Sequence, residues 1–173
     1  MNLHVNESKK PRFYLDTSVI GGCFDSEFSS YSNRLVELIK KRKVIPVISD
    51  LVLRELSHAP VKVRKIFAEL EWSDVFEIYQ LTKEILSLGD CYLAHDVVTK
   101  KSKDDAIHVA CATIARVDAI VSWNFKDIVR FDRIRGFNSV NVLQGYGILS
   151  ILSPQGVLGT EESSENENKK EKL

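Results

Sequence analysis

Three acidic residues far apart in the sequence, Asp16, Glu55 and Asp105, and one amide residue, Asn124, have side chains that can bind a metal ion. Carboxylate and amide oxygens are the ligands that Mg²⁺ or Mn²⁺ prefers in proteins. Carboxylates that crowd together repel one another, and a divalent cation removes this repulsion. A cation held in this way activates water and neutralises charge on a phosphoryl group. The residue types therefore favour phosphodiester hydrolysis, provided that the fold brings these side chains together.

Asp16 directly follows a short apolar segment, residues 13–15, whose β-favouring side chains predict a buried strand. An acid at the C-terminal end of a strand lies at the edge where open α/β sheets bind ligands. Asp is also a favoured N-cap residue, so capping of a following helix is an alternative role for Asp16.

Glu55 belongs to a predicted helix over residues 50–59, in which Leu51 and Ala59 lie one turn before and after it. Residues at this spacing share a helix face, so Glu55 is expected on the apolar, core-facing side. An acid in that position needs a cationic partner, a metal ion or a raised pKa. A structural salt bridge is therefore the alternative to a metal-ligand role.

Asp104 and Asp105 begin a predicted helix over residues 104–116 that is apolar almost all round and therefore buried on more than one side. Acids are favourable at a helix N-terminus, which accounts for one of the two. We expect Asp104 to face outward and Asp105 inward. His108, three residues after Asp105, is expected to be a hydrogen-bonded core residue rather than a catalytic base.

Ser122 and Asn124 come at the end of another predicted buried strand, residues 119–122. Oxygen-bearing side chains there again lie at the ligand-binding edge of a sheet, although Asn124 would also suit an ordinary helix cap. Trp123 lies between them. It has a ring on which a nucleic-acid base can stack, but packing in the core is the more usual role of such a residue.

Short apolar strands alternate with helices along the chain. The predicted strands cover residues 13–15, 44–48, 76–79, 119–122 and 148–152, and the predicted helices cover residues 33–43, 50–59, 60–70, 81–94, 104–116 and 126–135. This alternation predicts a three-layer α/β/α sandwich around a mostly parallel sheet of four or five strands. Pro46 indicates that the second strand is an edge strand or that the residue lies at a strand end.

The length of 173 residues suits one domain. The net charge is zero, so the overall charge of the protein does not indicate attraction to nucleic acid or to membranes. We expect a polar N-terminal tail over residues 1–11, a single domain over residues 12–158, and an acidic, disordered C-terminal tail over residues 159–173. The polar start is unlike a signal peptide, and no apolar run has the length of a membrane span. A cytoplasmic location is therefore expected, with no membrane partner.

The chain resembles a PIN domain, and within that family the VapC-type ribonucleases of toxin–antitoxin systems. The motifs that carry the resemblance are FYLDTSVIGG (13–22), ISDLVLREL (48–56), KSKDDAIHVACA (101–112) and VSWNFKDI (121–128). By this resemblance Asp16, Glu55 and Asp105 are the family's first three acids. Asn124 stands at the fourth acidic position. An amide ligates Mg²⁺ through its carbonyl but brings no charge, for which Asp104 or Asp127 would compensate.

The resemblance implies cleavage of RNA with Mg²⁺ or Mn²⁺, a homodimer, and inhibition by a cognate antitoxin protein. In the implied site, Asp16, Glu55 and Asp105 hold the ion, and Asn124 positions water or the scissile phosphate together with Thr17 and Ser122. The basic residues expected to guide RNA are Lys101, Lys103, Lys126 and Arg130. Such cations also suit a solvated helix face, which is the alternative reading of these four residues.

Two other functions remain open from the sequence. A metal-dependent phosphatase with an aspartyl nucleophile would want a second acid two residues after Asp16, where this chain has Ser18. A degenerate PIN domain would bind RNA or a protein partner without cleavage, and the amide of Asn124 is the feature that favours this alternative.

Overall fold

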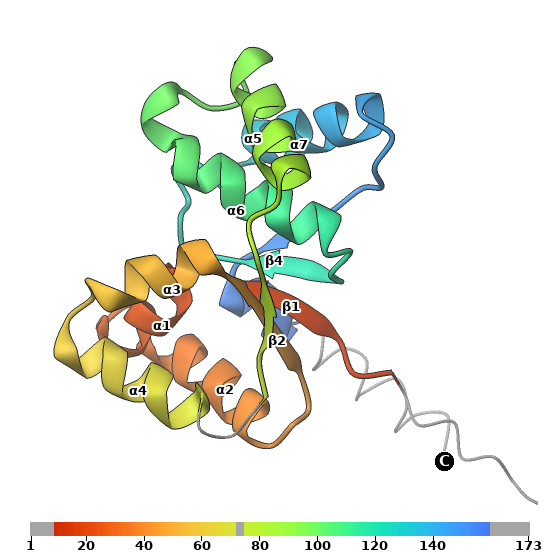
Figure 1. Ribbon diagram of the computed structural model, residues 1–173. Coiled ribbons are helices and arrows are strands. Elements are labelled where there is room, and N and C mark those ends of the chain that lie inside the picture. Colours follow the sequence, from red (N-terminus) through yellow and green to blue (C-terminus); the bar gives the residue numbers. More distant parts are fainter. Residues whose placement is uncertain (1–8, 72–74, 160–173) are drawn as a thin grey trace, which may run out of the picture.

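The computed structural model describes residues 9–71 and 75–159. Within these ranges, five parallel strands form one sheet in the order β3-β2-β1-β4-β5 (Figure 1). The strands are β1 (Arg12–Leu15), β2 (Ile45–Ser49), β3 (Glu77–Tyr79), β4 (Ala119–Val121) and β5 (Ser150–Leu152). The predicted parallel α/β sheet is confirmed. Most of the two predicted tails, residues 1–8 and 160–173, lies outside the described residues.

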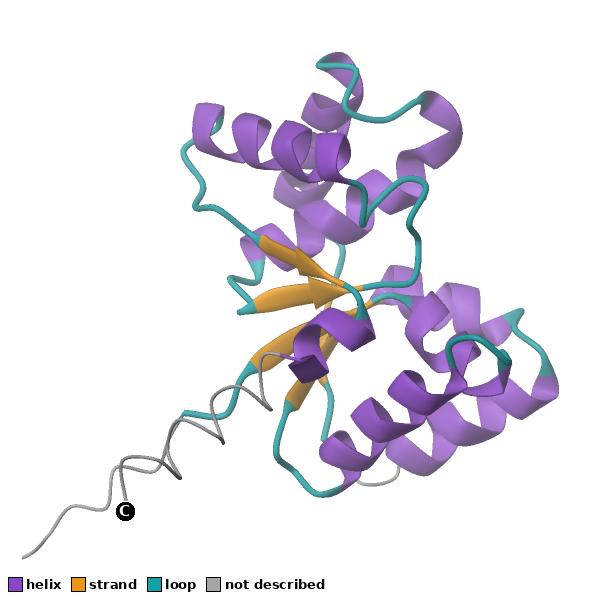
Figure 2. Cartoon of the chain, turned by 180° about the vertical axis from the view of Figure 1, so that it is seen from behind, coloured by secondary structure: helices purple, strands orange, loops and turns teal. Residues whose placement is uncertain are grey.

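Helices cover both faces of the sheet, so the molecule has three layers (Figures 1 and 2). One layer holds α1 (Thr17–Gly21), α2 (Ser29–Lys40), α3 (Asp50–Ser57) and α4 (Val61–Glu71), and the other holds α5 (Lys83–Ala94), α6 (Lys103–Ile114) and α7 (Phe131–Leu143). Two short 3-10 helices cover Gly22–Phe24 and Lys100–Ser102, and residues 154–159 are also helical. Among the described residues, no helix has the length and apolar character needed to cross a membrane.

Strand β1 lies in the middle of the sheet because its apolar residues must be covered on both faces. Phe13, Tyr14 and Leu15 are all buried. On one side β1 pairs with β2, and on the other side it pairs with β4, where Leu15 aligns with Val121. The strand order therefore reverses between β1 and β4, and the crevice at the carboxyl ends of these two strands is the expected ligand site of such a sheet.

Helix α6 is buried along most of its length, as its apolar sequence predicts. Every residue from Ala106 to Thr113 is buried, and the helix packs against α5 on one side and approaches the sheet on the other. Because α6 is enclosed, its polar residues must find partners inside the protein. The hydrogen-bond partners of Asp105 and His108 therefore show which groups α6 contacts at the edge of the sheet.

Of the two positions that Pro46 indicated, the structure shows a strand end rather than an edge strand, because β2 lies between β1 and β3 and Pro46 is its second residue. Pro46 is tolerated because the pairing of β2 with β3 begins only at Val47, one residue later. In a parallel strand, successive N–H groups point to alternate neighbours, and the N–H of Ile45 donates toward the β1 side. The missing N–H of Pro46 thus faces the side on which no β3 residue is paired.

The predicted helix over residues 126–135 is wrong, because α7 begins at Phe131 and runs to Leu143. Asn124 holds the preceding turn, since its side-chain oxygen accepts the N–H of Asp127 and its backbone carbonyl accepts the N–H groups of Ile128 and Val129. The helix continues past Gly136 because buried partners satisfy its polar residues. Tyr92 donates a hydrogen bond to Asn141, which is fully buried.

Candidate active site

Asp16 lies at the point where the strand order reverses. Its backbone N–H continues the sheet by donating to Val121 O at 3.1 Å, and its side chain is almost fully buried. The hydroxyls of Ser18 and Ser122 both donate to Asp16 Oδ2, at 2.7 and 2.6 Å. These two bonds fix the carboxylate and leave Oδ1 to face the groups on the opposite side of the crevice.

Glu55 reaches the same crevice from α3. Its Oε2 accepts a hydrogen bond from the hydroxyl of Thr17, and its Oε1 lies 3.2 Å from His108 Nε2. The side chain is 30% exposed, so it lines the opening of the crevice rather than the core. The helix-face prediction is therefore only partly met: Glu55 points toward Asp16, at the boundary between the apolar face and solvent.

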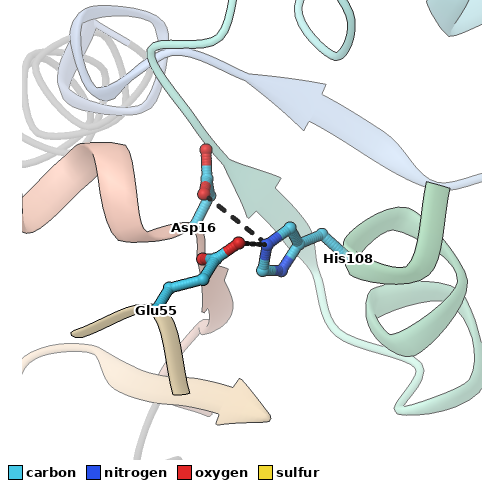
Figure 3. Close-up of side chains that lie close together, drawn as sticks. All are labelled: Asp16, Glu55 and His108. Atoms are coloured by element: carbon cyan, nitrogen blue, oxygen red, sulfur yellow. Dashed lines mark hydrogen bonds and ion pairs between the residues drawn. The ribbon is translucent and has the colours of Figure 1, made fainter. Parts of the chain in front are cut away.

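His108 lies between the two acids. Figure 3 shows the carboxylates of Asp16 and Glu55 turned toward its imidazole, with Nε2 4.0 Å from Asp16 Oδ1. One ligand atom from each of the three residues lies within 4.8 Å of the others. His108 is a buried, hydrogen-bonded residue, as its place on an apolar helix predicts, but the sequence does not reveal its partners. His108 lies one helical turn from Ala112 and three residues after Asp105, so the sequence places it on the same helix face as Asp105. This spacing was the feature that could have indicated its place beside the acids.

A buried chain of hydrogen bonds extends from this cluster into the protein. His108 Nδ1 lies 2.9 Å from the hydroxyl of Tyr14, which lies 2.7 Å from Ser49 Oγ. Complete burial alone would lower the pKa of His108, but the hydrogen bond to Glu55 and the charge of Asp16 outweigh it and raise this pKa. Desolvation of Glu55 is likewise outweighed by His108, so the pKa of Glu55 is lowered. An imidazolium thus balances part of the negative charge of the acids.

Asp105 enters the crevice from the first turn of α6 and is held by Asn124. Asn124 Nδ2 donates to Asp105 Oδ1 at 2.8 Å, while Asn124 Oδ1 accepts the N–H of Asp127 at 2.9 Å. Burial and the negative charge of Asp127 raise the pKa of Asp105 to about 6. Asn124 therefore orients Asp105, and its oxygen is already engaged by the backbone.

The two acids expected to compensate for Asn124 lie in different surroundings. Asp104 faces outward, its side chain 60% exposed, and its carboxylate is 3.9 Å from Arg54. Asp127 is buried and close enough to Asp105 to influence its ionisation. Asp127 thus adds to the negative charge around Asp105, whereas Asp104 does not.

The basic residues expected to guide RNA are all exposed, but three of them lie close to acids, Lys126 with its Nζ 3.9 Å from Asp127 Oδ2. Lys103 lies 3.1 Å from Asp90, and Arg130 donates two hydrogen bonds to Asp132 at 2.6 Å. Lys101 lies on the 3-10 helix just before α6. Lys126 follows the Asn124 turn, and its side chain is 86% exposed.

Comparison with known families identifies the fold and covers most of the acids described above, although Asp127 lies one residue beyond the match. Residues 12–126 match the family model of the PIN domain. The chain belongs to the PIN domain family. PIN domains are generally nucleases, and the matched segment contains Asp16, Glu55, Asp105 and Asn124.

Some solved structures are similar to this chain, whereas no curated protein matches it. One similar chain comes from the VapBC2 complex of Rickettsia felis bound to a DNA fragment from their promoter. The two chains are 16% identical, the match covers 82% of this chain and 98% of the other, and the TM-score is 0.49.

Proposed function

We propose that this PIN domain is a divalent-metal-dependent ribonuclease that hydrolyses phosphodiester bonds of RNA. The observation that carries the proposal is the convergence of Asp16 and Glu55 on one crevice, with ligand atoms within 4.8 Å of each other and of His108. Asp105 is not among the residues within this distance of one another, but burial and the negative charges of Asp127 and Asp16 raise its pKa. Such crowding is unfavourable for folding and favourable for holding a cation.

The donors in this crevice fit Mg²⁺ or Mn²⁺, because they are carboxylate oxygens held by other polar groups. Asp16, Glu55 and Asp105 would hold the ion. When bound, the ion lowers the pKa of water and neutralises charge on the phosphoryl group. The hydroxyls orient the acids, since Ser122 donates to Asp16 and Thr17 donates to Glu55.

His108 and Asn124 are positioning residues in this proposal. Asn124 donates to Asp105, and His108 holds Glu55 through Nε2 while Tyr14 holds its Nδ1. The hydrogen bonds fix the acids before substrate arrives, which reduces the reorganisation needed during the reaction. Asp127 acts on Asp105 through its negative charge and is not one of the residues that would hold the ion.

RNA as the substrate, a cognate antitoxin as the inhibitor, a homodimeric state and a cytoplasmic location belong to the same proposal. They follow from the PIN-domain motifs and from exposed cations such as Lys101 and Lys126 beside the acids. A second candidate is a PIN domain that binds RNA or a protein without cleavage. Asn124 favours this candidate, because an amide replaces a charge at the fourth acidic position.

The decisive experiment compares RNA cleavage by the wild type, Asp16→Asn and Asp104→Asn with Mn²⁺, with Mg²⁺ and with a chelator. We expect metal-dependent cleavage by the wild type, a loss of at least about 100-fold in Asp16→Asn, and near-normal activity in Asp104→Asn. Asp104→Asn is the matched control, because it removes an exposed carboxylate outside the group. Equal residual cleavage by wild type and Asp16→Asn would refute the hydrolase proposal and favour binding without cleavage.

A further inference from the structure

An aromatic cluster lies beside Asn124, formed by two rings on the segment that follows β4 and by Phe28 just before α2. The ring of Trp123 stacks on Phe28 with centroids 4.3 Å apart and an angle of 17° between the planes. Phe125 lies 5.9 Å from Trp123 and 6.3 Å from Phe28, so the three rings are in mutual contact. We call Phe28, Trp123 and Phe125 the aromatic shelf.

Trp123 is the buried support of this shelf and is not available to a ligand. Its indole N–H donates to Ser32 Oγ at 2.8 Å, and its backbone N–H donates to Ser18 Oγ at 3.0 Å. Gly22 leaves room for the ring, because a Cβ at that position would lie 2.7 Å from Trp123 Nε1. Of the two roles considered from the sequence, the structure gives Trp123 the packing role.

Phe125 is the exposed member, with 47% of its surface accessible to solvent. The shelf supports its ring, and its backbone follows Asn124, whose side chain is bonded to Asp105 and whose N–H donates to Ser122 Oγ. The same Ser122 hydroxyl is bonded to Asp16. The exposed ring of Phe125 is thus held in a fixed position, directly after the residue whose side chain binds Asp105.

Cations accompany the shelf. Lys126 directly follows Phe125 and extends into solvent. On the chain segment that contributes Phe28, Phe24 is also exposed, and Lys62 lies 4.8 Å above its ring. The ammonium of Lys126 lies 3.9 Å from Asp127 Oδ2 but remains 86% exposed, so an anion can still reach it. An exposed aromatic face beside an accessible cation matches a nucleotide, which has a flat apolar base and an anionic phosphate. It matches a purely apolar partner less well, because burial of Lys126 would be costly.

We propose, building on the ribonuclease function above, that the exposed face of Phe125 is a subsite that stacks one unpaired base of single-stranded RNA. The base belongs to a nucleotide adjacent to the scissile phosphate, and Lys126 contacts the phosphate of that nucleotide. A base in a duplex is already stacked and paired, so the subsite selects single strands or loops over double helices. Stacking tolerates any base, so this contact adds affinity with little sequence preference.

Binding is measured with the full chain carrying Asp16→Asn, so that the RNA stays intact in Mg²⁺. The probe is a short single-stranded RNA in which 2-aminopurine, whose fluorescence falls on stacking, replaces one base at a time. We expect one position to be quenched on binding. Phe125→Leu should remove this quenching and weaken binding roughly 5- to 100-fold, whereas Phe125→Trp should retain both.

Phe131→Leu is the matched control, because it makes the same change at a 75% exposed phenylalanine outside the shelf. It should leave quenching and affinity as in the parent. An abasic nucleotide at the quenched position should weaken binding about as much as Phe125→Leu, and the two losses should not add. Equal losses for Phe125→Leu and Phe131→Leu would overturn the subsite.

Two outcomes separate this subsite from the function on which it rests. If Phe125→Leu binds and quenches as the parent does while the wild type cleaves RNA, the subsite is wrong and the exposed ring faces a protein partner instead. If the parent quenches through Phe125 but the wild type never cleaves RNA with metal, the subsite stands. In that case the ribonuclease proposal fails.

Discussion

The metal-free protein should be more stable when Asp105 loses its charge. Folding raises the pKa of this carboxyl from about 3.9 to about 6, chiefly through burial and the charge of Asp127. The difference of about two pKa units corresponds to about 3 kcal/mol, and solvent screening at this half-buried site reduces it to about 1–2 kcal/mol. Because the folded pKa is raised, the protonated form favours folding. Its contribution is complete below about pH 4 and is lost as the pH rises through about 6.

Asp105→Asn removes the ionisation and keeps an oxygen that can accept from Asn124. At pH 7 in chelator, we expect the variant to melt about 2–8 °C above the wild type. At pH 4.5 the difference should shrink to roughly a third, since Asp105 is then mostly protonated in the folded protein but still largely ionised in the unfolded chain. Scanning fluorimetry at both pH values measures this difference in Tm. Groups that titrate equally in the two proteins cancel when the two Tm values are subtracted at each pH.

The control is Asp104→Asn, which changes the neighbouring but outward-facing acid. Asp104 pairs only weakly with Arg54, so this variant should melt at or slightly below the wild type at both pH values. With Mn²⁺ added, the order at pH 7 should reverse, because the wild type gains stability from the ion and Asp105→Asn loses a ligand. A variant Asp105→Asn that is less stable than the wild type in chelator at pH 7, or whose gain is as large at pH 4.5 as at pH 7, would contradict this prediction.

Two further variants test other parts of the site. Glu55→Gln should fold normally by circular dichroism but show less than about half of the wild-type rise in Tm with Mn²⁺, because a charged ligand is lost; an undiminished rise would exclude Glu55 from the ligand set. Gly22→Ala should lower Tm by several degrees, about 1–3 kcal/mol, and alter the near-UV signal of Trp123, because the new Cβ meets its ring. An unchanged near-UV spectrum would show that the shelf adapts without cost.

Much of the fold could be predicted because local sequence and tertiary environment agree. The apolar residues 13–15 predict a buried strand, and the apolar surface of α6 predicts an enclosed helix; both predictions are confirmed. Helix α7 could not be placed correctly, because Gly136 and Asn141 disfavour a helix locally. The tertiary contact of Asn141 with Tyr92 outweighs this low propensity.

The acids of the site could be chosen from the sequence, but their partners could not. Asp16 and Asp105 each follow a local pattern, a strand end and a helix start, that indicates which way the side chain points. The contact of His108 with Glu55 depends on how α6 and α3 approach across the sheet edge. Likewise, Trp123 and Phe125 follow the same strand, and only the packing decides which ring is covered.

The strand order also has a consequence for a chain that is still being made by the ribosome. Strand β1 is synthesised first, but its partner β4 comes much later, and Asp16 and Ser122 are 106 residues apart in the chain. Until β4 and α6 emerge, Asp16 has only the Ser18 hydroxyl and lacks both the Ser122 hydroxyl and the second helical layer. The arrangement of acids seen in the folded PIN domain can therefore form only after almost three quarters of the chain, up to Ser122, has been synthesised.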